Sequence, residues 1–190
     1  MEANLFTRER LESAVNALTG RRQTFASVLN EARDYSYASS GQKTIFLSHS
    51  HHDAKYVHVT RKFFENLGLS IYVDWADDSM PKRTCGETAT KIKHKILMND
   101  KFVLLATDLA LMSKWCNWEV GIGDTVKLSE DNIVILPLVY NTGEWRGNEY
   151  LQIYPYIKGP EYDYMISSPN NYNVHYPDGH EVSLVRWLQK

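Results

Sequence analysis

Trp115 and Glu119, four positions apart, carry the side chains best suited to chemistry in this 190-residue chain. They lie in a predicted helix that begins at Ser113, a helix-capping residue, and runs into two glycines. Residues four apart share one helical face, where core packing alone would favour an apolar residue over an acid. A planar or cationic ligand fits between an indole and a carboxylate. Two plainer interpretations stay open: Trp115 packs in the core, and Glu119 is an ordinary surface acid.

The second candidate for chemistry is the His-x-His-x-Asp pattern of His49, His51 and Asp53, which follows a short apolar run. Binuclear zinc hydrolases use this spacing, with the imidazoles on one metal and the aspartate on the second. Their full motif continues with a histidine, where this chain has Ala54, and no later pattern of metal-binding residues follows. The better prediction is a polar loop in which Asp53 caps the next helix, with no metal bound.

Other catalytic signatures are weak or missing. Gly121-Ile-Gly123 lies inside a predicted helix, so it favours close helix packing over dinucleotide binding. The sequence has no Walker-type phosphate loop and no Gly-x-Ser-x-Gly elbow. Cys116 has no evident histidine partner, and together with Cys85 it makes too few cysteines for a disulfide framework. Both are expected to be reduced thiols.

Apolar runs that alternate with amphipathic segments predict the elements that position these side chains. Such runs belong to a parallel sheet covered by helices on both faces, which right-handed crossovers turn into a doubly wound, flavodoxin-like α/β fold. Ligands in that fold bind beyond the carboxyl ends of the strands, where the loops converge with the start of the Trp115/Glu119 helix. The predicted strands are 43–48, 69–74, 101–107 and 132–140, and the helices between them are 54–67, 85–98 and 113–128.

An N-terminal helical extension with its linker, residues 1–42, is predicted to precede the α/β domain, residues 43–190. Apolar stripes at helical spacing within residues 4–33, broken at Gly20, predict two short helices. These helices are expected to dock on the main domain or on a second copy of the chain. Beyond residue 140 the pattern weakens, and the predicted elements are an edge strand near 162–166, a loop over 167–179 and a helix over 184–188.

Composition limits the classes of function. A formal net charge of -2 gives no reason to expect a nucleic acid or an anionic membrane as partner. No apolar run approaches the ~20 residues that span a bilayer. The charged N-terminus lacks the apolar core of a signal peptide, so the expected location is the cytoplasm.

Three segments, in order, resemble TIR (Toll/interleukin receptor) domains. The segment 45–53 (IFLSHSHHD) is similar to the first strand and loop of the family. Val73-Asp74 and the Pro-bearing loop after it resemble the second strand and its long loop. The segment 113–119 (SKWCNWE) resembles the family's S-x-W-C-x-x-E helix. Finally, 78–81 and 148–156 resemble the bacterial subgroup linked to Thoeris antiphage defence.

The resemblance implies an enzyme that consumes NAD⁺ as its substrate and needs no other cofactor. The family's catalytic glutamate stands where Glu119 does, and an aromatic residue stands where Trp115 does. Nicotinamide is cationic in NAD⁺ and leaves without a general acid, so one carboxylate suffices to stabilise the oxocarbenium-like ribose. The indole of Trp115 can stack on a heteroaromatic ring. The resemblance also implies a pocket lined by Ser48, His49, Asp74, Trp75 and Asp78, although the family often has Tyr or Phe in place of His49.

The resemblance further implies partners. Water, an adenine nitrogen or a histidine imidazole captures the ribose, which gives ADP-ribose, a cyclic isomer or a histidine conjugate, and the sequence does not separate these products. The product would activate a separate effector protein. The loop 75–83 would join protomers in a homo-oligomer. The main alternative is a non-catalytic TIR interaction module; a zinc hydrolase and a nucleoside deoxyribosyltransferase are the others.

Overall fold

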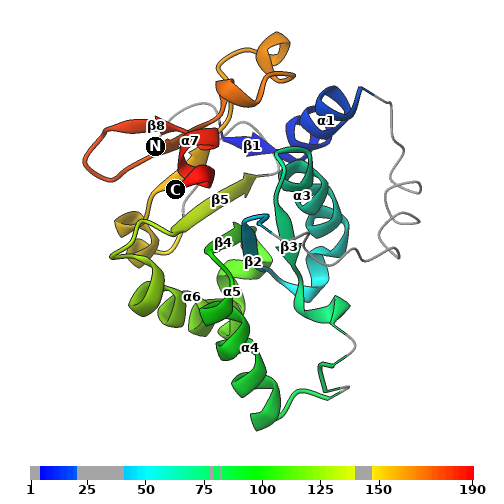
Figure 1. The fold of residues 1–190 in the computed structure, drawn as a ribbon, viewed down its shortest axis with the longest axis vertical. Helices are drawn as coiled ribbons and strands as arrows, with labels where there is room; N and C mark the ends of the chain where they lie inside the picture. Colours follow the sequence, from blue (N-terminus) through cyan, green and yellow to red (C-terminus); the bar gives the residue numbers. More distant parts are fainter. Residues whose placement is uncertain (1–4, 21–40, 78, 82, 140–146) are drawn as a thin grey trace.

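A central sheet organises the protein, whose computed structural model describes residues 5–20, 41–77, 79–81, 83–139 and 147–190. Within these residues the sheet has eight strands, in the order β3-β2-β4-β5-β6-β7-β8, with β1 paired to β5 (Figure 1). The strands are β1 (Phe6–Thr7), β2 (Thr44–Ser48), β3 (Ser70–Tyr72), β4 (Lys101–Ala106), β5 (Ile133–Val139), β6 (Tyr156–Lys158), β7 (Asn173–His175) and β8 (Glu181–Ser183).

The five strands from β3 to β6 are parallel and follow the 2-1-3-4-5 order of flavodoxin-like folds. The direction of the strand order reverses between β2 and β4, which is where such folds bind ligands. Two antiparallel strands, β7 and β8, extend the sheet beyond β6. The predicted doubly wound α/β class is therefore confirmed.

Helices cover both faces of the sheet. Alternate residues of the buried strands point to opposite sides, so Ile45 and Leu47 of β2 belong to one apolar cluster and Phe46 to the other. The first cluster also holds side chains from α1, α3 and α7, and the second holds side chains from α4, α5 and α6. The helices are α1 (Arg8–Thr19), α3 (Ala54–Asn66), α4 (Gly86–Met98), α5 (Asp108–Met112), α6 (Lys114–Lys127) and α7 (Leu184–Gln189).

The predicted strands and helices between residues 43 and 139 are confirmed to within two residues at each end, and so is the closing helix. One further helix, α5, was not predicted; it lies between β4 and α6. A hydroxyl group caps the start of each of these two adjacent helices. Thr107 caps α5 by accepting from the Ala110 N–H (3.0 Å), and Ser113 caps α6 by accepting from the Cys116 N–H (3.3 Å).

The start of the N-terminal extension differs from the prediction. Phe6 and Thr7 form β1 rather than a helix, because Phe6 pairs with Leu138 of β5 and is buried in the core. Thr7 is extended and caps α1, its hydroxyl accepting from the Arg10 N–H at 3.1 Å. α1 packs on α3 through a stripe that includes Leu11, so this helix docks on the main domain. The second predicted N-terminal helix lies outside the described residues, and the boundary at residue 42 stays a prediction.

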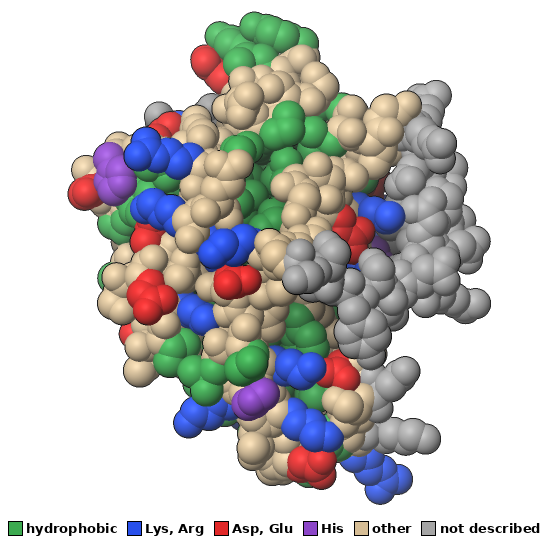
Figure 2. Space-filling model, in the orientation of Figure 1, with side chains coloured by type: hydrophobic (Ala, Val, Ile, Leu, Met, Phe, Trp, Pro, Cys, Tyr) green, Lys and Arg blue, Asp and Glu red, His purple; other side chains and the backbone are tan. Residues whose placement is uncertain are grey.

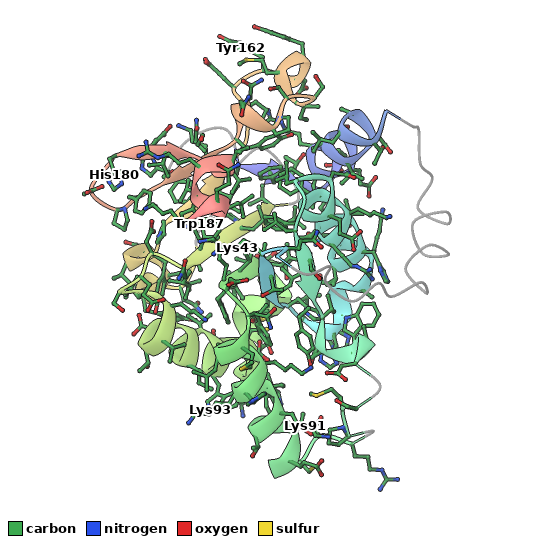
Figure 3. All side chains as sticks on the ribbon, viewed as in Figure 1. Lys43, Lys91, Lys93, Tyr162, His180 and Trp187 are labelled. Atoms are coloured by element: carbon green, nitrogen blue, oxygen red, sulfur yellow. The ribbon has the colours of Figure 1, made fainter. Side chains whose placement is uncertain are left out.

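The prediction was also wrong in the C-terminal third. In place of the edge strand near 162–166, residues 163–165 form one 3-10 turn, with Tyr164 exposed. The supposed loop after it contains β7, of which only Val174 is fully buried. A strand with one buried residue is too short to show periodicity. Figure 3 places Tyr162 at the end of the molecule opposite α4.

Charged groups of both signs are interspersed on the face of the molecule shown in Figure 2, in keeping with the small net charge. Among the described residues, every helix falls short of the length and apolar character that a bilayer span requires.

Candidate active site

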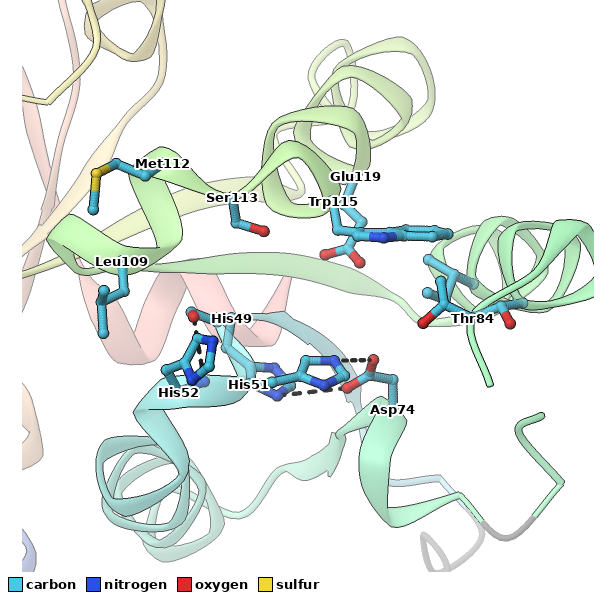
Figure 4. A pocket seen from close by; sticks show the side chains of 13 residues that line it. His49, His51, His52, Asp74, Thr84, Leu109, Met112, Ser113, Trp115 and Glu119 are labelled. Carbon is cyan, nitrogen blue, oxygen red and sulfur yellow. Dashed lines mark hydrogen bonds and ion pairs between the residues drawn. The ribbon is translucent and has the colours of Figure 1, made fainter. Parts of the chain in front are cut away.

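A cavity of about 400 Å³ opens beyond the carboxyl ends of β2 and β3, next to the start of α6 (Figure 4). This is the position that the strand order predicts. The lining residues are His49, Ser50, His51, His52, Asp74, Thr84, Thr88, Ile92, Leu109, Met112, Ser113, Trp115 and Glu119.

Glu119 is a buried acid at this cavity, with 5% of its surface exposed. Its Oε2 accepts a hydrogen bond of 2.6 Å from the Ser48 hydroxyl at the end of β2. Burial raises the pKa of Glu119 to about 8, and the charge of Asp74 adds to the rise, whereas Ser48 and His51 oppose it. The interpretation of Glu119 as a surface acid is therefore wrong.

Trp115 lies one turn before Glu119 and lines the same cavity. Its ring is 36% exposed and meets the edge of Trp118, with centroids 5.4 Å apart. Trp118 is 38% exposed and does not line the cavity. Neither tryptophan belongs to the core, whereas Cys116 between them is buried. The exposed indole of Trp115 is thus free to contact a planar ring.

Close packing of α6 on the sheet involves only one of its two glycines. A Cβ on Gly123 would meet the ring of Phe102 at 3.1 Å, so a side chain here would have to push against β4. At Gly121 a Cβ would meet open space. Gly123 brings α6 close to the sheet, and this approach holds Glu119 over the end of β2.

The wall opposite Glu119 carries a carboxylate between two imidazoles (Figure 4). Asp74 Oδ2 lies 3.1 Å from His51 Nε2, and Asp74 Oδ1 lies 3.5 Å from His49 Nε2. The Trp75 N–H also donates to Asp74 Oδ1, at 2.8 Å. Burial by itself would raise the pKa of Asp74, but the hydrogen bond with His51 and the two imidazole charges hold it below its ordinary value.

The two imidazoles differ in their environments. His49 is buried, its Nδ1 donates to the Leu47 carbonyl (2.9 Å), and its Nε2 has no hydrogen-bond partner among the described residues. Burial lowers the pKa of His49, and this effect outweighs the charge of Asp74, which acts to raise it. His51 is exposed, and the hydrogen bond with Asp74 raises its pKa, with the charge of Glu119 adding to the rise. Burial thus favours the neutral form of His49, whereas Asp74 favours the protonated form of His51.

The structure brings together most of the predicted pocket. Glu119, Trp115, His49 and Asp74 line the cavity, and Ser48 reaches it through its hydrogen bond to Glu119. Trp75 does not line the cavity, and its ring makes edge-to-face contacts with His49 and His58. Asp78 lies outside the described residues, so its place in the pocket stays a prediction.

Several lining residues were not predicted. Thr88 and Ile92 belong to α4, whose sequence shows only an ordinary amphipathic helix. His51 was considered only as a metal ligand or as part of a polar loop. Its hydrogen bond joins it to Asp74, 23 positions away on another segment, and no local pattern reveals such a pair.

The position of Asp53 does not fit the binuclear zinc motif that the spacing of His49, His51 and Asp53 suggested. Its carboxylate is buried and accepts a hydrogen bond from the Thr107 hydroxyl rather than facing His49 and His51. Within the described residues, no group of three or more His, Cys, Asp or Glu side chains is placed to hold a metal ion. Asp53 precedes α3, as predicted, but its side chain makes no capping hydrogen bond.

Residues 45–162 match the family model of the TIR domain, and the chain belongs to that family. Two relatives make the comparison more specific. The chain is 30% identical over 151 residues to the probable 3' cyclic ADP-D-ribose synthase ThsB' of Bacillus cereus (strain MSX-D12), over 77% of this chain and 75% of that protein. It is 35% identical over 79 residues to a candidate cyclic ADP-D-ribose synthase, TIR2, of Cytobacillus dafuensis, over 40% of this chain and 21% of that protein.

Proposed function

We propose that this chain is a TIR enzyme that breaks the bond between nicotinamide and ribose in NAD⁺ and turns the ADP-ribosyl group into a cyclic nucleotide messenger. The observation that carries the proposal is the buried Glu119, held by Ser48 at the cavity that Trp115 lines. The names of both relatives, which are cyclic ADP-D-ribose synthases, support the same reaction.

The electrostatics of the site suit a cationic substrate. Glu119 must be ionised to stabilise a developing ribosyl cation, and burial disfavours the ionised form. The positive charge of the nicotinamide ring favours the carboxylate again, so substrate binding turns Glu119 into the active form. In a dry pocket this charge interaction is stronger than in water. The indole of Trp115 supplies a stacking surface for one of the two planar rings.

The proposed role is signalling in antiphage defence, with NAD⁺ as the only small-molecule partner. The diffusible product would activate a separate effector protein. The loop 75–83, of which residues 78 and 82 lie outside the described part, would join protomers in a homo-oligomer. A non-catalytic interaction module is the second candidate, since this loop and the exposed aromatic residues around the cavity also suit binding between proteins.

The test is nicotinamide release from NAD⁺, measured by liquid chromatography with and without extract from phage-infected cells. Glu119→Gln should lower the rate by about 10²-fold or more, because it removes the charge that stabilises the ribosyl cation. Glu130→Gln is the matched control, since Glu130 is an exposed carboxylate far from the cavity lining. Normal turnover in Glu119→Gln would contradict the proposal. A wild-type protein that releases no nicotinamide either with or without the extract would favour the interaction module.

A further inference from the structure

The cavity has a second polar group that the cleavage step does not use. Cleavage requires Glu119, whereas the opposite wall presents His51 hydrogen-bonded to Asp74 (Figure 4). With Nε2 donating to Asp74 Oδ2, the other ring nitrogen of His51, Nδ1, is left without a protein partner among the described residues. This is the arrangement by which a carboxylate fixes the tautomer of a histidine base.

Other contacts hold both Asp74 and His51 in place. Asp74 is held in turn by the Trp75 N–H and faces the buried His49, so its carboxylate is fixed at the end of β3. His51 sits in a 3-10 turn whose start is capped by Ser50. The side chain of His51 is 68% exposed, and it lines the cavity. A base in this position is accessible both to a bound substrate and to solvent, where it can lose its proton afterwards.

The nucleophile that captures the ribose decides whether such a base is needed. An adenine nitrogen attacks with a lone pair and has no proton to lose. A ribose hydroxyl must lose its proton as the new bond forms, and a base nearby makes that attack competitive with water. A His–Asp pair across the cavity from Glu119 therefore fits attack by a hydroxyl group.

We propose that His51, oriented by Asp74, is the base that accepts the proton of a hydroxyl group on the adenosine ribose. This hydroxyl attacks the ribose that carries nicotinamide, and the product is an O-linked cyclic ADP-ribose. The proposal rests on the proposed function. The C1–N bond to nicotinamide breaks and its electron pair leaves with nicotinamide, which departs neutral. The hydroxyl oxygen forms the new bond to C1, and its proton passes to His51 Nδ1 and then to solvent. Asp74 is a positioning residue that stabilises the imidazolium formed.

The first test measures the ratio of cyclic product to linear ADP-ribose by chromatography and mass spectrometry. His51→Gln should lower this ratio by about 10²-fold, because the hydroxyl loses its base while water remains abundant. Nicotinamide release should change far less, since it depends on Glu119. The control His94→Gln changes an exposed histidine of α4 that does not line the cavity, and it should leave the ratio unchanged.

Exchange with an added pyridine base separates a lost proton acceptor from a damaged pocket. A pyridine nitrogen has no proton to lose, so His51→Gln should still exchange nicotinamide for 3-acetylpyridine at close to the wild-type rate. A variant that loses exchange and cyclisation together would overturn the proposal.

The pH profile tests the role of Asp74. The titratable groups facing His51 are Asp74 at the end of β3, Glu119 on α6 and His49 on its own loop. The cyclic-to-linear ratio should rise with pH as His51 loses its proton, and Asp74→Asn should move that rise to lower pH, because the hydrogen-bonded anion raises the pKa of His51. A ratio that is independent of pH, or a midpoint that Asp74→Asn leaves in place, would contradict the assignment.

The identity of the wild-type product is the last check. An N-linked cyclic product, or ADP-ribose alone, with normal nicotinamide release would overturn only the role of His51. Absence of nicotinamide release would instead remove the proposed function on which it rests.

Discussion

Ser48 and Glu119 lie 71 positions apart in the chain, and the Ser48 hydroxyl donates a 2.6 Å hydrogen bond to Glu119 Oε2. This bond joins the carboxyl end of β2 to the first turns of α6, across the point where the strand order reverses. It is the main contact that favours the ionised form of a carboxylate which burial would keep neutral. Ser48 thus lowers the pH at which Glu119 becomes ionised, against the larger effect of burial.

Ser48→Ala should shift the pH dependence of catalysis to higher pH. Loss of the hydroxyl removes a hydrogen bond worth about 1–2 kcal/mol to the carboxylate, so the pKa of Glu119 rises further and kcat/KM near neutral pH falls about tenfold. The check is kcat/KM for nicotinamide release measured from about pH 6 to pH 10. The deficit should close at the alkaline end; an equal deficit at every pH would show that Ser48 does not act through the ionisation of Glu119.

Glu119→Gln should stabilise the fold increasingly as pH rises from about 4.5 to 8, and by a constant amount above that. The folded-state pKa of Glu119, about 8, lies above the ordinary value of 4.5, so its contribution to stability is fully present below about pH 4.5 and is lost as pH rises through 8. A neutral glutamine avoids this loss, which is on the order of 5 kcal/mol for a rise of the pKa from 4.5 to about 8. Urea unfolding of both proteins at about pH 4.5, 7 and 9 measures the difference. A constant offset across the three would count against a buried, neutral Glu119.

Trp115→Ala should weaken substrate binding more than Trp118→Ala does. Both indoles are about equally exposed, but only Trp115 lines the cavity. Stacking of a base on an aromatic ring contributes about 1–3 kcal/mol, so KM for NAD⁺ should rise about tenfold or more in Trp115→Ala. Steady-state kinetics of the two variants provide the measurement. Similar effects at both positions would mean that the edge-to-face pair acts as one structural unit.

The two glycines of α6 should respond in opposite ways to alanine. Gly121→Ala places its methyl group in open space and should stabilise the helix by about 0.5–1 kcal/mol. Gly123→Ala presses on the fully buried ring of Phe102 and should destabilise the protein by about 1–3 kcal/mol, which exceeds the helical gain. Denaturant unfolding compares the two variants directly. A stable Gly123→Ala would show that β4 and α6 can move apart.

The parts of the fold that sequence analysis predicted are those with long, periodic apolar patterns. β4 and β5 are almost continuous apolar runs, and α6 follows a capping serine. The type and order of these three elements could therefore be predicted. The rule that ligands bind beyond the strand ends then placed Trp115 and Glu119 at the site.

The parts that could not be predicted depend on contacts between distant segments. β1 has two residues and is a strand only because it pairs with Leu138 and Val139. β7 depends on β6 and β8 at its sides. The role proposed for His51 depends on Asp74, and local spacing pointed instead to a metal motif that Asp53 does not complete.

The pairing of β1 with the end of β5 has a consequence for synthesis of the protein. Phe6 finds its partner Leu138 more than 130 residues later in the chain, and β1 is parallel to it, so no local hairpin can form in the meantime. Its ring also packs against Tyr172, which comes later still. During translation, β1 must therefore stay unpaired, with the side chain of Phe6 uncovered, until the segments that carry Leu138 and Tyr172 have also emerged from the ribosome.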